Sequence, residues 1–295
     1  MAYRIRTLTP DEAPAFIPLT FPAYAPRLIR GGLAVGAYQG REPVGLALLA
    51  PGGERRAELL SLYVTLGHRN RNLGRTILGL AEDAAAQRGA MGMHTVWSQG
   101  LASARAFESV LAARGWSEPV QRMLTLHGDM DSEFGEGVRR MYPKYESPDC
   151  LPRRYGFSTW RDMGEEDRWF IRSREGRPGW YEPRANPFRE EACLDQDMSL
   201  VLRKDGLIVG WLTIHRTLPG TLRYTDVFLR EDLKRAGAVA ITLVTHAFWR
   251  QLAEGTPLLT MAVEKDNAGL VQMYQKRLAV GAKVNWTLGS SKSFV

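Results

Sequence analysis

The chain has 295 residues, of which 44% are hydrophobic and 24% charged, and its formal net charge is +7. This length accommodates two ordinary domains, and the composition is that of a globular protein with sizeable cores. No apolar run approaches the roughly 20 residues that cross a bilayer, and the basic residues are scattered, which argues against a membrane-spanning protein and against a nucleic-acid-binding basic block.

The first 128 residues alternate between strand and helix patterns. A strand is expected at residues 3–7, followed by a helix that Pro10 opens, with acidic residues in its first turn. Two strand-like runs, 32–38 and 43–50, flank a turn and predict a hairpin. Further expected elements are a strand at 59–64, a helix at 75–87, a strand at 93–97, a helix at 103–114 and a last strand at 121–127. This βαβββαβαβ order predicts an α/β (α+β) fold in which helices pack on a mixed sheet.

Residues 129–150 differ from the sequence on either side. They are acidic at first, contain glycine and proline and show little periodicity, so they predict a linker. The pattern resumes after it, with strands expected at 157–161, 199–203, 207–215, 223–228, 258–263 and 284–288, and helices at 165–174, 238–253 and 268–277. The sequence thus predicts two domains, 1–128 and 151–295, joined by this linker.

The second half repeats the first at a nearly constant offset. Adding 163 to Val64 and Gly74 gives Val227 and Gly237, and the element order is the same in both halves. A repeat of this length predicts a duplicated domain rather than a short solenoid repeat.

A polar junction follows the strand that ends at Val64, where residues 64–78 read VTLGHRNRNLGRTIL. A loop of this kind before a helix offers free backbone N–H groups and the positive end of the helix dipole, which favour phosphate oxygens. Gly74 allows a ligand to approach the backbone closely. Three arginines add positive charge: Arg69, Arg71 and Arg75. The junction predicts a phosphate site, and the alternative is a solvated loop with ordinary arginines.

This segment resembles the cofactor-binding signature of the GNAT acyltransferases, R/Q-x-x-G-x-G/A, which begins five residues after a strand valine. The preceding Leu62, Tyr63 and Val64 resemble the fourth strand of that family. The resemblance covers residues 3–128, and 155–290 more weakly, so the chain resembles two GNAT domains in tandem. The positions that match the signature are Arg69, Asn70, Arg71, Asn72, Leu73 and Gly74, with Asn72 in place of the first glycine.

The resemblance implies an N-acetyltransferase that uses acetyl-CoA as cosubstrate and needs no metal. The pantetheine arm would lie between the fourth and fifth strands and pair with the backbone of Leu62 and Val64, and the pyrophosphate would rest on N–H groups of residues 69–75, including Arg75. A backbone N–H near Tyr63 or Val64 would polarise the thioester carbonyl. A primary amine of a small molecule or peptide would attack directly, without a covalent enzyme intermediate.

Acid and base residues follow less directly from the resemblance. Glu58 is the one acid next to the fourth strand and is a candidate general base, although it also fits an exposed charge at a strand start. The family's helix motif N-x-x-A-x-x-x-Y is incomplete at residues 103–114, where Asn and Tyr are both missing. Tyr63, Ser98 or water is therefore left to protonate the leaving thiolate.

The second half shows the opposite losses. Asn267 and Tyr274 match the helix motif, but the loop at residues 232–237 starts with Asp232, whose carboxylate repels phosphate. Arg235 stands where the first glycine should be and would crowd a ligand. We therefore expect cofactor binding in the first half and a degenerate second copy, in which Tyr274 is a packed core residue.

Two other functions fit parts of the sequence. A non-catalytic acyl-CoA-binding or regulatory module is consistent with the missing Asn and Tyr, and a peptidoglycan-type aminoacyl transferase is also built from paired domains of this kind. The intact CoA loop argues against the second. The two cysteines, Cys150 and Cys193, form no disulfide framework, so we expect a cytoplasmic protein.

Overall fold

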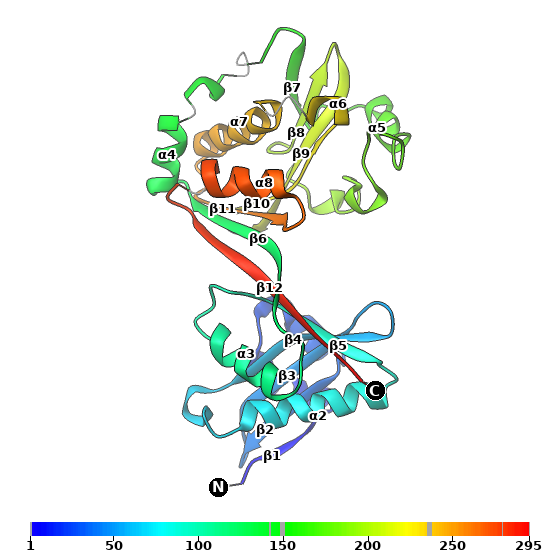
Figure 1. The fold of residues 1–295 in the computed structure, drawn as a ribbon, viewed down its shortest axis with the longest axis vertical. Helices are drawn as coiled ribbons and strands as arrows, with labels where there is room; N and C mark the ends of the chain where they lie inside the picture. Colours follow the sequence, from blue (N-terminus) through cyan, green and yellow to red (C-terminus); the bar gives the residue numbers. More distant parts are fainter. Residues whose placement is uncertain (1, 142, 148–150, 235–237, 279, 295) are drawn as a thin grey trace. The chain divides into compact units, whose positions relative to one another are not determined.

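The structure, a computed structural model, describes residues 2–141, 143–147, 151–234, 238–278 and 280–294. The chain forms two compact units (Figure 1). The N-terminal unit comprises Met1–Met123 and Asn285–Val295, and the C-terminal unit comprises Leu124–Val284. Each unit contains strands with helices packed on them, which confirms the predicted α/β class.

The N-terminal unit is built on a mixed sheet in the order β1-β2-β3-β4-β5-β12. Neighbouring strands are antiparallel except for β4 and β5, which run parallel. The bounds are β1 (Arg4–Thr7), β2 (Ala34–Gln39), β3 (Glu42–Pro51), β4 (Arg56–Val64), β5 (Gly92–Ser98) and β12 (Lys283–Ser293). The expected strands of the first half, 3–7 to 93–97, are thus present with small shifts at their ends.

Helices cover both faces of this sheet. The bounds are η1 (Pro10–Leu19), η2 (Pro22–Tyr24), α1 (Ala25–Ile29), η3 (Leu66–His68), α2 (Leu73–Gln87) and α3 (Ala104–Ala113). In α2, Leu73, Ile77 and Ala81 recur at helical spacing and are buried in a core with α3 and the sheet. A second core, which includes Phe16 and Leu28, lies between the opposite face of the sheet and the segment η1–α1.

The strand beside β5 comes from the end of the chain. Residues 287–293 of β12 pair antiparallel with residues 92–98 of β5, as Figure 1 shows. The sequence instead predicts residues 121–127 as the last strand of the first half. Strand β6 (Val120–Asp129) is not a neighbour of β5, and from Leu124 onward it belongs to the C-terminal unit beside β11. Local alternation predicts that a segment is a strand, but the choice of its partner depends on distant residues.

The start of η1 is fixed by Glu12. Its carboxylate accepts hydrogen bonds from the backbone N–H of Thr9 (3.1 Å), the Thr9 hydroxyl (3.1 Å) and the Tyr38 hydroxyl (2.8 Å), and it forms an ion pair with Arg6. The hydrogen bond from the Thr9 backbone, followed by those from Tyr38, the Thr9 hydroxyl and Arg6, lowers the Glu12 pKa from 4.5 to about 2, against the opposing effect of burial.

This shift predicts a specific acid sensitivity. A carboxyl whose pKa is lower in the folded state stabilises the fold above its unfolded pKa, and that contribution is lost as the pH falls from about 4.5 towards 2. We expect Glu12→Gln to lower the free energy of unfolding at pH 7 and to flatten its decline over this pH range, as measured by urea denaturation. Glu42→Gln, an exposed acid at the start of β3, is the control. Equal slopes for Glu12→Gln and the unmodified chain would contradict the assignment.

The strands of the C-terminal unit lie side by side in the order β6-β11-β10-β9-β8-β7. Its strands after β6 are β7 (Tyr155–Thr159), β8 (Leu200–Lys204), β9 (Leu207–Leu218), β10 (Thr221–Leu229) and β11 (Leu258–Glu264). Its helices are α4 (Glu133–Met141), η4 (Pro143–Tyr145), α5 (Glu165–Arg172), η6 (Pro183–Ala185), η7 (Glu191–Cys193), α6 (Glu231–Lys234), α7 (Ala238–Glu254), α8 (Ala268–Met273) and η8 (Tyr274–Leu278). No helix in the described part of the chain is long and apolar enough to cross a membrane.

The segment 129–150, expected to be a linker, contains helix α4. Phe134 and Val138 of α4 are buried, and the Phe134 ring packs edge-on against Phe248 of α7 at 5.6 Å between centroids. Gly135 and Gly137 weaken the helical signal in the sequence. Gly135 is required by packing, since a Cβ there would lie 1.9 Å from the Met130 carbonyl oxygen. The compact units therefore divide the chain differently from the expected ranges 1–128, 129–150 and 151–295.

Candidate functional site

Strands β4 and β5 separate after a short paired stretch. Their parallel pairing consists of three pairs, Arg56 with Gly92, Ala57 with Met93 and Glu58 with His94. Beyond this point β5 pairs on its other edge with β12, and β4 pairs on its other edge with β3. Beyond Glu58, this edge of β4 therefore has no partner strand within the described chain. The Leu59 carbonyl accepts from the Thr95 hydroxyl at 2.9 Å and the Val64 carbonyl accepts from the Arg69 guanidinium at 3.0 Å, and the other N–H and C=O groups of the edge are available to a ligand that lies along them.

A β-bulge in β4 coincides with this separation. Leu48 and Leu49 of β3 pair with Ser61 and Leu59, so Leu60 is an extra residue in β4. Ala57 and Leu59 pack on the side of α2, Leu60 packs on the opposite side, and Leu62 and Val64 return to the side of α2. The bulge thus shifts the alternation of every side chain that follows it.

The bulge also places the two candidate catalytic residues on one face. Residues 58 and 63 of a regular strand would point to opposite faces because their separation is odd. With the extra residue between them, Glu58 and Tyr63 both alternate with the residues that pack on α2, so both lie on the face away from α2. Glu58 is half-buried and is the last residue of β4 that pairs with β5, whereas Tyr63 is 37% exposed.

The loop from β4 to α2 contains two asparagines in the left-handed region. Asn70 has φ +60° and Asn72 has φ +61°, and Asn72 is the residue that precedes α2. Asparagine tolerates this conformation better than other side chains, although glycine adopts it at least cost. Asn72 stands where the GNAT signature has a glycine, and it adopts the left-handed backbone conformation that a glycine would adopt there without strain.

The amide groups of this loop do not form hydrogen bonds with the part of the chain that the structure describes. No described residue accepts a hydrogen bond from the backbone N–H of residues 70–75, and the first bonds of the helix start at Thr76, whose N–H donates to the Asn72 carbonyl at 3.1 Å. Successive amides around a left-handed residue and at a helix start form a concave donor surface that suits an anion. This arrangement is the one the sequence predicts for a pyrophosphate.

The arginines of the loop are exposed and are not neutralised. The Arg69 guanidinium donates to the Val64 carbonyl at 3.0 Å and lies 5.7 Å from the Tyr63 ring centroid, and Arg71 donates to the Tyr3 hydroxyl at 3.3 Å. Neither these two residues nor Arg75 forms an ion pair with a described carboxylate. Their positive charge is therefore available to a polyanionic ligand.

His68 and Gly74 have different roles in the loop. The His68 ring nitrogens contact the Thr65 hydroxyl at 2.8 Å and the Gln39 amide oxygen at 2.6 Å. His68 thus connects the start of the loop to the end of β2. A Cβ on Gly74 would make only ordinary contacts, at 3.7 Å, with Val64 and Val110. The protein itself therefore has room for alanine at position 74.

The described part of the corresponding segment in the C-terminal unit, residues 230–234, forms hydrogen bonds within the protein. The Glu231 N–H donates to the Gly179 carbonyl at 3.1 Å, and the Asp232 carboxylate accepts from the Arg230 guanidinium at 2.6 and 2.9 Å. The expected crowding by Arg235 and the position of Gly237 lie outside the described residues. Strands β10 and β11 nevertheless separate after Tyr224, and β10 also carries a bulge there, so the framework of the first half is repeated.

The helix motif of the second half is structural in the described chain. The Asn267 side chain caps α8 by accepting from the Leu270 N–H at 3.3 Å. Tyr274 is 4% exposed, and its burial raises the pKa of its hydroxyl well above the ordinary value. The prediction that Tyr274 is a packed core residue is therefore consistent with its position.

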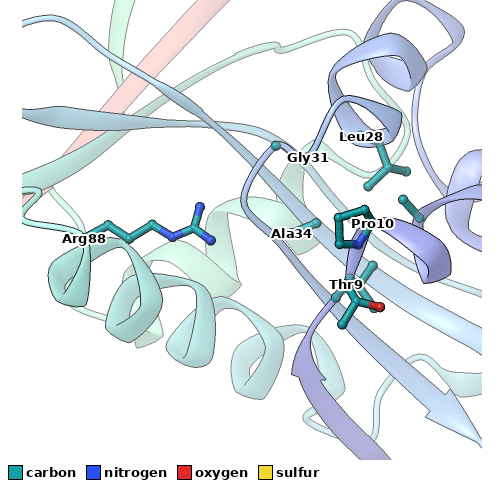
Figure 2. Close-up of a pocket in the computed structure, with 9 residues that line it drawn as sticks. Thr9, Pro10, Leu28, Gly31, Ala34 and Arg88 are labelled. Carbon is teal, nitrogen blue, oxygen red and sulfur yellow. The ribbon is translucent and has the colours of Figure 1, made fainter.

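A small cavity lies apart from the predicted site. It has a volume of about 120 Å³ and is formed by η1, α1 and the start of β2, with Arg88 reaching towards it from the end of α2 (Figure 2). None of the site residues predicted from the sequence lines it. Among the described residues, no group of three or more His, Cys, Asp and Glu side chains is arranged to hold a metal ion.

Comparisons with known proteins identify a family model and solved structures that are similar to this chain. The acetyltransferase (GNAT) family model matches residues 4–111. Similar solved structures include a GCN5-related N-acetyltransferase from Sphaerobacter thermophilus, with 17% identity, 99% of this chain and 95% of that chain covered, and a TM-score of 0.66. A tandem GNAT protein from the clavulanic acid biosynthesis pathway has 16% identity, covers 99% and 98% of the two chains, and has a TM-score of 0.67. At these identities the similarity to solved structures shows the fold alone. The search of curated proteins found no match.

Proposed function

We propose that this chain, which matches the GNAT family model over residues 4–111 and has the fold of tandem GNAT structures, is an N-acetyltransferase that uses acetyl-CoA and a primary amine. The observation that carries the proposal is the row of unused amides at residues 70–75, beside the unpaired edge of β4. The charge of the N-terminal unit supports it, because this unit has 15 Lys and Arg against 9 Asp and Glu, a net charge of +6 out of the +7 of the chain.

Two parts of acetyl-CoA, the pyrophosphate and the pantetheine arm, have proposed partners in the chain. The amides of residues 70–75 and the guanidinium groups of Arg69, Arg71 and Arg75 would hold the pyrophosphate. Backbone groups of Leu62 and Val64 would pair with the amides of the pantetheine arm, as an added strand does. Acetyl-CoA supplies the activated acyl group as a thioester.

In the proposed reaction the amine nitrogen forms a bond to the acyl carbon, and the carbon–sulfur bond breaks. A backbone N–H near Tyr63 or Val64 would donate to the carbonyl oxygen as negative charge develops on it. Glu58, at the point where β4 and β5 separate, would take the proton that the amine loses, directly or through water. Tyr63, which shares its face of the sheet, would return a proton to the thiolate. We place this reaction in the cytoplasm.

The first test is binding of the intact donor. We expect acetyl-CoA at about 100 times its dissociation constant to raise the melting temperature by roughly 5–10 °C, because a ligand at that excess stabilises the native state by about 2.7 kcal/mol. Acetyl-pantetheine, which lacks the pyrophosphate, should give a much smaller shift. The double variant Arg69→Glu/Arg71→Glu should weaken acetyl-CoA binding about tenfold or more, since it removes and reverses charge-assisted contacts.

The double variant Arg30→Glu/Arg88→Glu is the matched control for this variant. It makes the same charge change at two exposed residues away from the loop, one after α1 and one at the opposite end of α2. Its effect on the affinity for acetyl-CoA should be small. Equal weakening by both variants would show that Arg69 and Arg71 contribute only through the net charge of the chain. If millimolar acetyl-CoA did not change the melting temperature, this result would count against the proposed function itself.

A non-catalytic acyl-CoA-binding module is the second candidate. It is favoured by the absence of the motif's Asn and Tyr from α3, which follows β5 in the N-terminal unit. Release of free thiol from acetyl-CoA, measured with a panel of primary amines, distinguishes the two functions. Turnover with any amine supports the enzyme, and tight binding without turnover supports the module.

A further inference from the structure

The side chain of Thr95 lies where strands β4 and β5 stop pairing. The last pair of their parallel ladder is Glu58 with His94, so Leu59 and Thr95 are the next residues along the two strands. Thr95 is 3% exposed, and its hydroxyl donates to the Leu59 carbonyl at 2.9 Å. The proposed acetyl transfer assigns no role to Thr95.

This hydrogen bond ends the ladder without leaving the Leu59 carbonyl unsatisfied. In a parallel ladder, the carbonyls of one strand accept from backbone N–H groups of the neighbouring strand. The Leu59 carbonyl accepts from a side chain instead, so side-chain atoms connect the two strands at this point. Leu59 is 2% exposed, and a buried carbonyl without a donor is costly. The Thr95 hydroxyl therefore stabilises the arrangement in which the strands separate.

Both strands have a fixed neighbour on their other edge at this level. Thr95 pairs with Ser290 of β12, whose hydroxyl donates to the Ser117 carbonyl at 2.7 Å. Leu59 pairs with Leu49 of β3, directly before the bulge of β4. The bond between Thr95 and Leu59 thus connects these two pairs at the residue where β4 and β5 begin to separate.

We propose that the Thr95 hydroxyl is a positioning group that sets where β4 and β5 separate, so that the β4 edge at Leu62 and Val64 stays accessible to the pantetheine arm of acetyl-CoA. Without the hydroxyl, the Leu59 carbonyl would regain a donor by pairing with a backbone N–H of β5. The ladder would then extend along β4 and cover part of the edge that the pantetheine arm needs. Thr95 acts through the Leu59 backbone and does not contact the reacting atoms. The inference rests on the proposed function, to which it adds a residue of β5.

The test compares two ligands that differ in the pantetheine arm. Acetyl-CoA carries the arm, whereas 3′-phosphoadenosine 5′-diphosphate is the nucleotide part of CoA without it. Isothermal titration measures the affinity of both ligands for the unmodified full chain, for Thr95→Val and for Thr95→Ser. Valine has nearly the shape of threonine but no hydroxyl, and serine keeps the hydroxyl, so the two variants separate the hydrogen bond from the packing.

We expect Thr95→Val to weaken the binding of acetyl-CoA about tenfold, because it leaves the Leu59 carbonyl without its donor. The affinity for the nucleotide should change little, since the amides of residues 70–75 follow the end of β4 and do not depend on its pairing with β5. Thr95→Ser should bind both ligands nearly as the unmodified chain does. Thr287→Val is the control, because it removes a hydroxyl of β12 that donates to the Met123 carbonyl at 3.2 Å, and it should change neither affinity.

The outcomes are distinguishable because the unmodified chain is measured with the same ligands. The proposal is overturned if Thr95→Val binds acetyl-CoA as tightly as the unmodified chain, if it weakens the binding of both ligands equally, or if Thr95→Ser binds acetyl-CoA as weakly as Thr95→Val. If Thr95→Val does not fold, Thr95→Ala, which also lacks the hydroxyl, takes its place in the same comparison. Failure of the unmodified chain to bind acetyl-CoA overturns the proposed function itself, and the role of Thr95 with it.

Discussion

Replacing Glu82 by alanine is expected to lower the free energy of unfolding of the N-terminal unit by about 3–5 kcal/mol, because it leaves two partly buried cations without their counter-charge and the buried Trp116 without its acceptor. The Glu82 side chain is 4% exposed and accepts hydrogen bonds from Arg114 (2.6 Å), Trp116 (2.7 Å) and Lys292 (2.7 Å). These partners come from the end of α3, the residues after it, and β12. Glu82 thus joins α2 to the strand that the end of the chain contributes to this unit.

Urea denaturation of three variants measures this effect. Asp83→Ala changes the next residue of α2, which is exposed, and should change stability by less than about 0.5 kcal/mol. Glu82→Gln keeps the size of the side chain and one acceptor oxygen but loses the charge, so its cost should lie between the two. If Glu82→Ala proves no more destabilising than Asp83→Ala, the three contacts do not stabilise the unit.

Replacing Asn72 by valine is expected to weaken the binding of acetyl-CoA about tenfold or more. Asn72 has φ +61°, and a β-branched side chain in the left-handed region costs roughly 1–2 kcal/mol or more. The loop would relieve this strain by rotating its backbone, and the amides of residues 70–75 would then no longer converge on one anion. This prediction rests on the proposed function.

Asn72→Gly is the matched control at the same position. Glycine adopts positive φ without strain, so the loop should keep its conformation, and affinity should stay within a few-fold of the unmodified chain. Isothermal titration with acetyl-CoA compares the three proteins, and circular dichroism confirms that each is folded. Weakening of the same size in Asn72→Gly and Asn72→Val would show that the Asn72 side chain, and not the backbone conformation, contributes to binding.

The loop at residues 69–75 is a feature that neighbouring residues in the sequence are sufficient to predict. A strand valine, a run of Arg and Asn, and a glycine at the start of a helical pattern are all neighbours in the chain, and they predict a short loop with free amides at a helix start. The structure contains this loop, with its amides unused by the described residues. The left-handed conformation of Asn72 was also open to inference, because the matching position of the GNAT signature is a glycine.

The candidate catalytic residues could be named from the sequence but not placed on one face. Glu58 and Tyr63 are separated by an odd number of residues, and regular alternation would put them on opposite sides of the sheet. The bulge at Leu60 reverses this relation. No residue of β4 by itself indicates a bulge, because the position of the bulge depends on the register between β4 and β3.

The sequence by itself determined most of the strands and helices and the loop between β4 and α2, since each depends on residues that are near one another in the chain. It also indicated the duplication, because the two halves can be compared along their whole length. Only the tertiary structure decided that β12 rather than β6 lies beside β5, that α4 packs on α7, and that the Thr95 hydroxyl meets the Leu59 carbonyl where β4 and β5 separate. Backbone hydrogen bonds are nearly the same for any pair of strands, so local pattern leaves the partner open. The partner is selected by contacts between distant residues, such as Lys292 with Glu82, that exist only once the chain has folded.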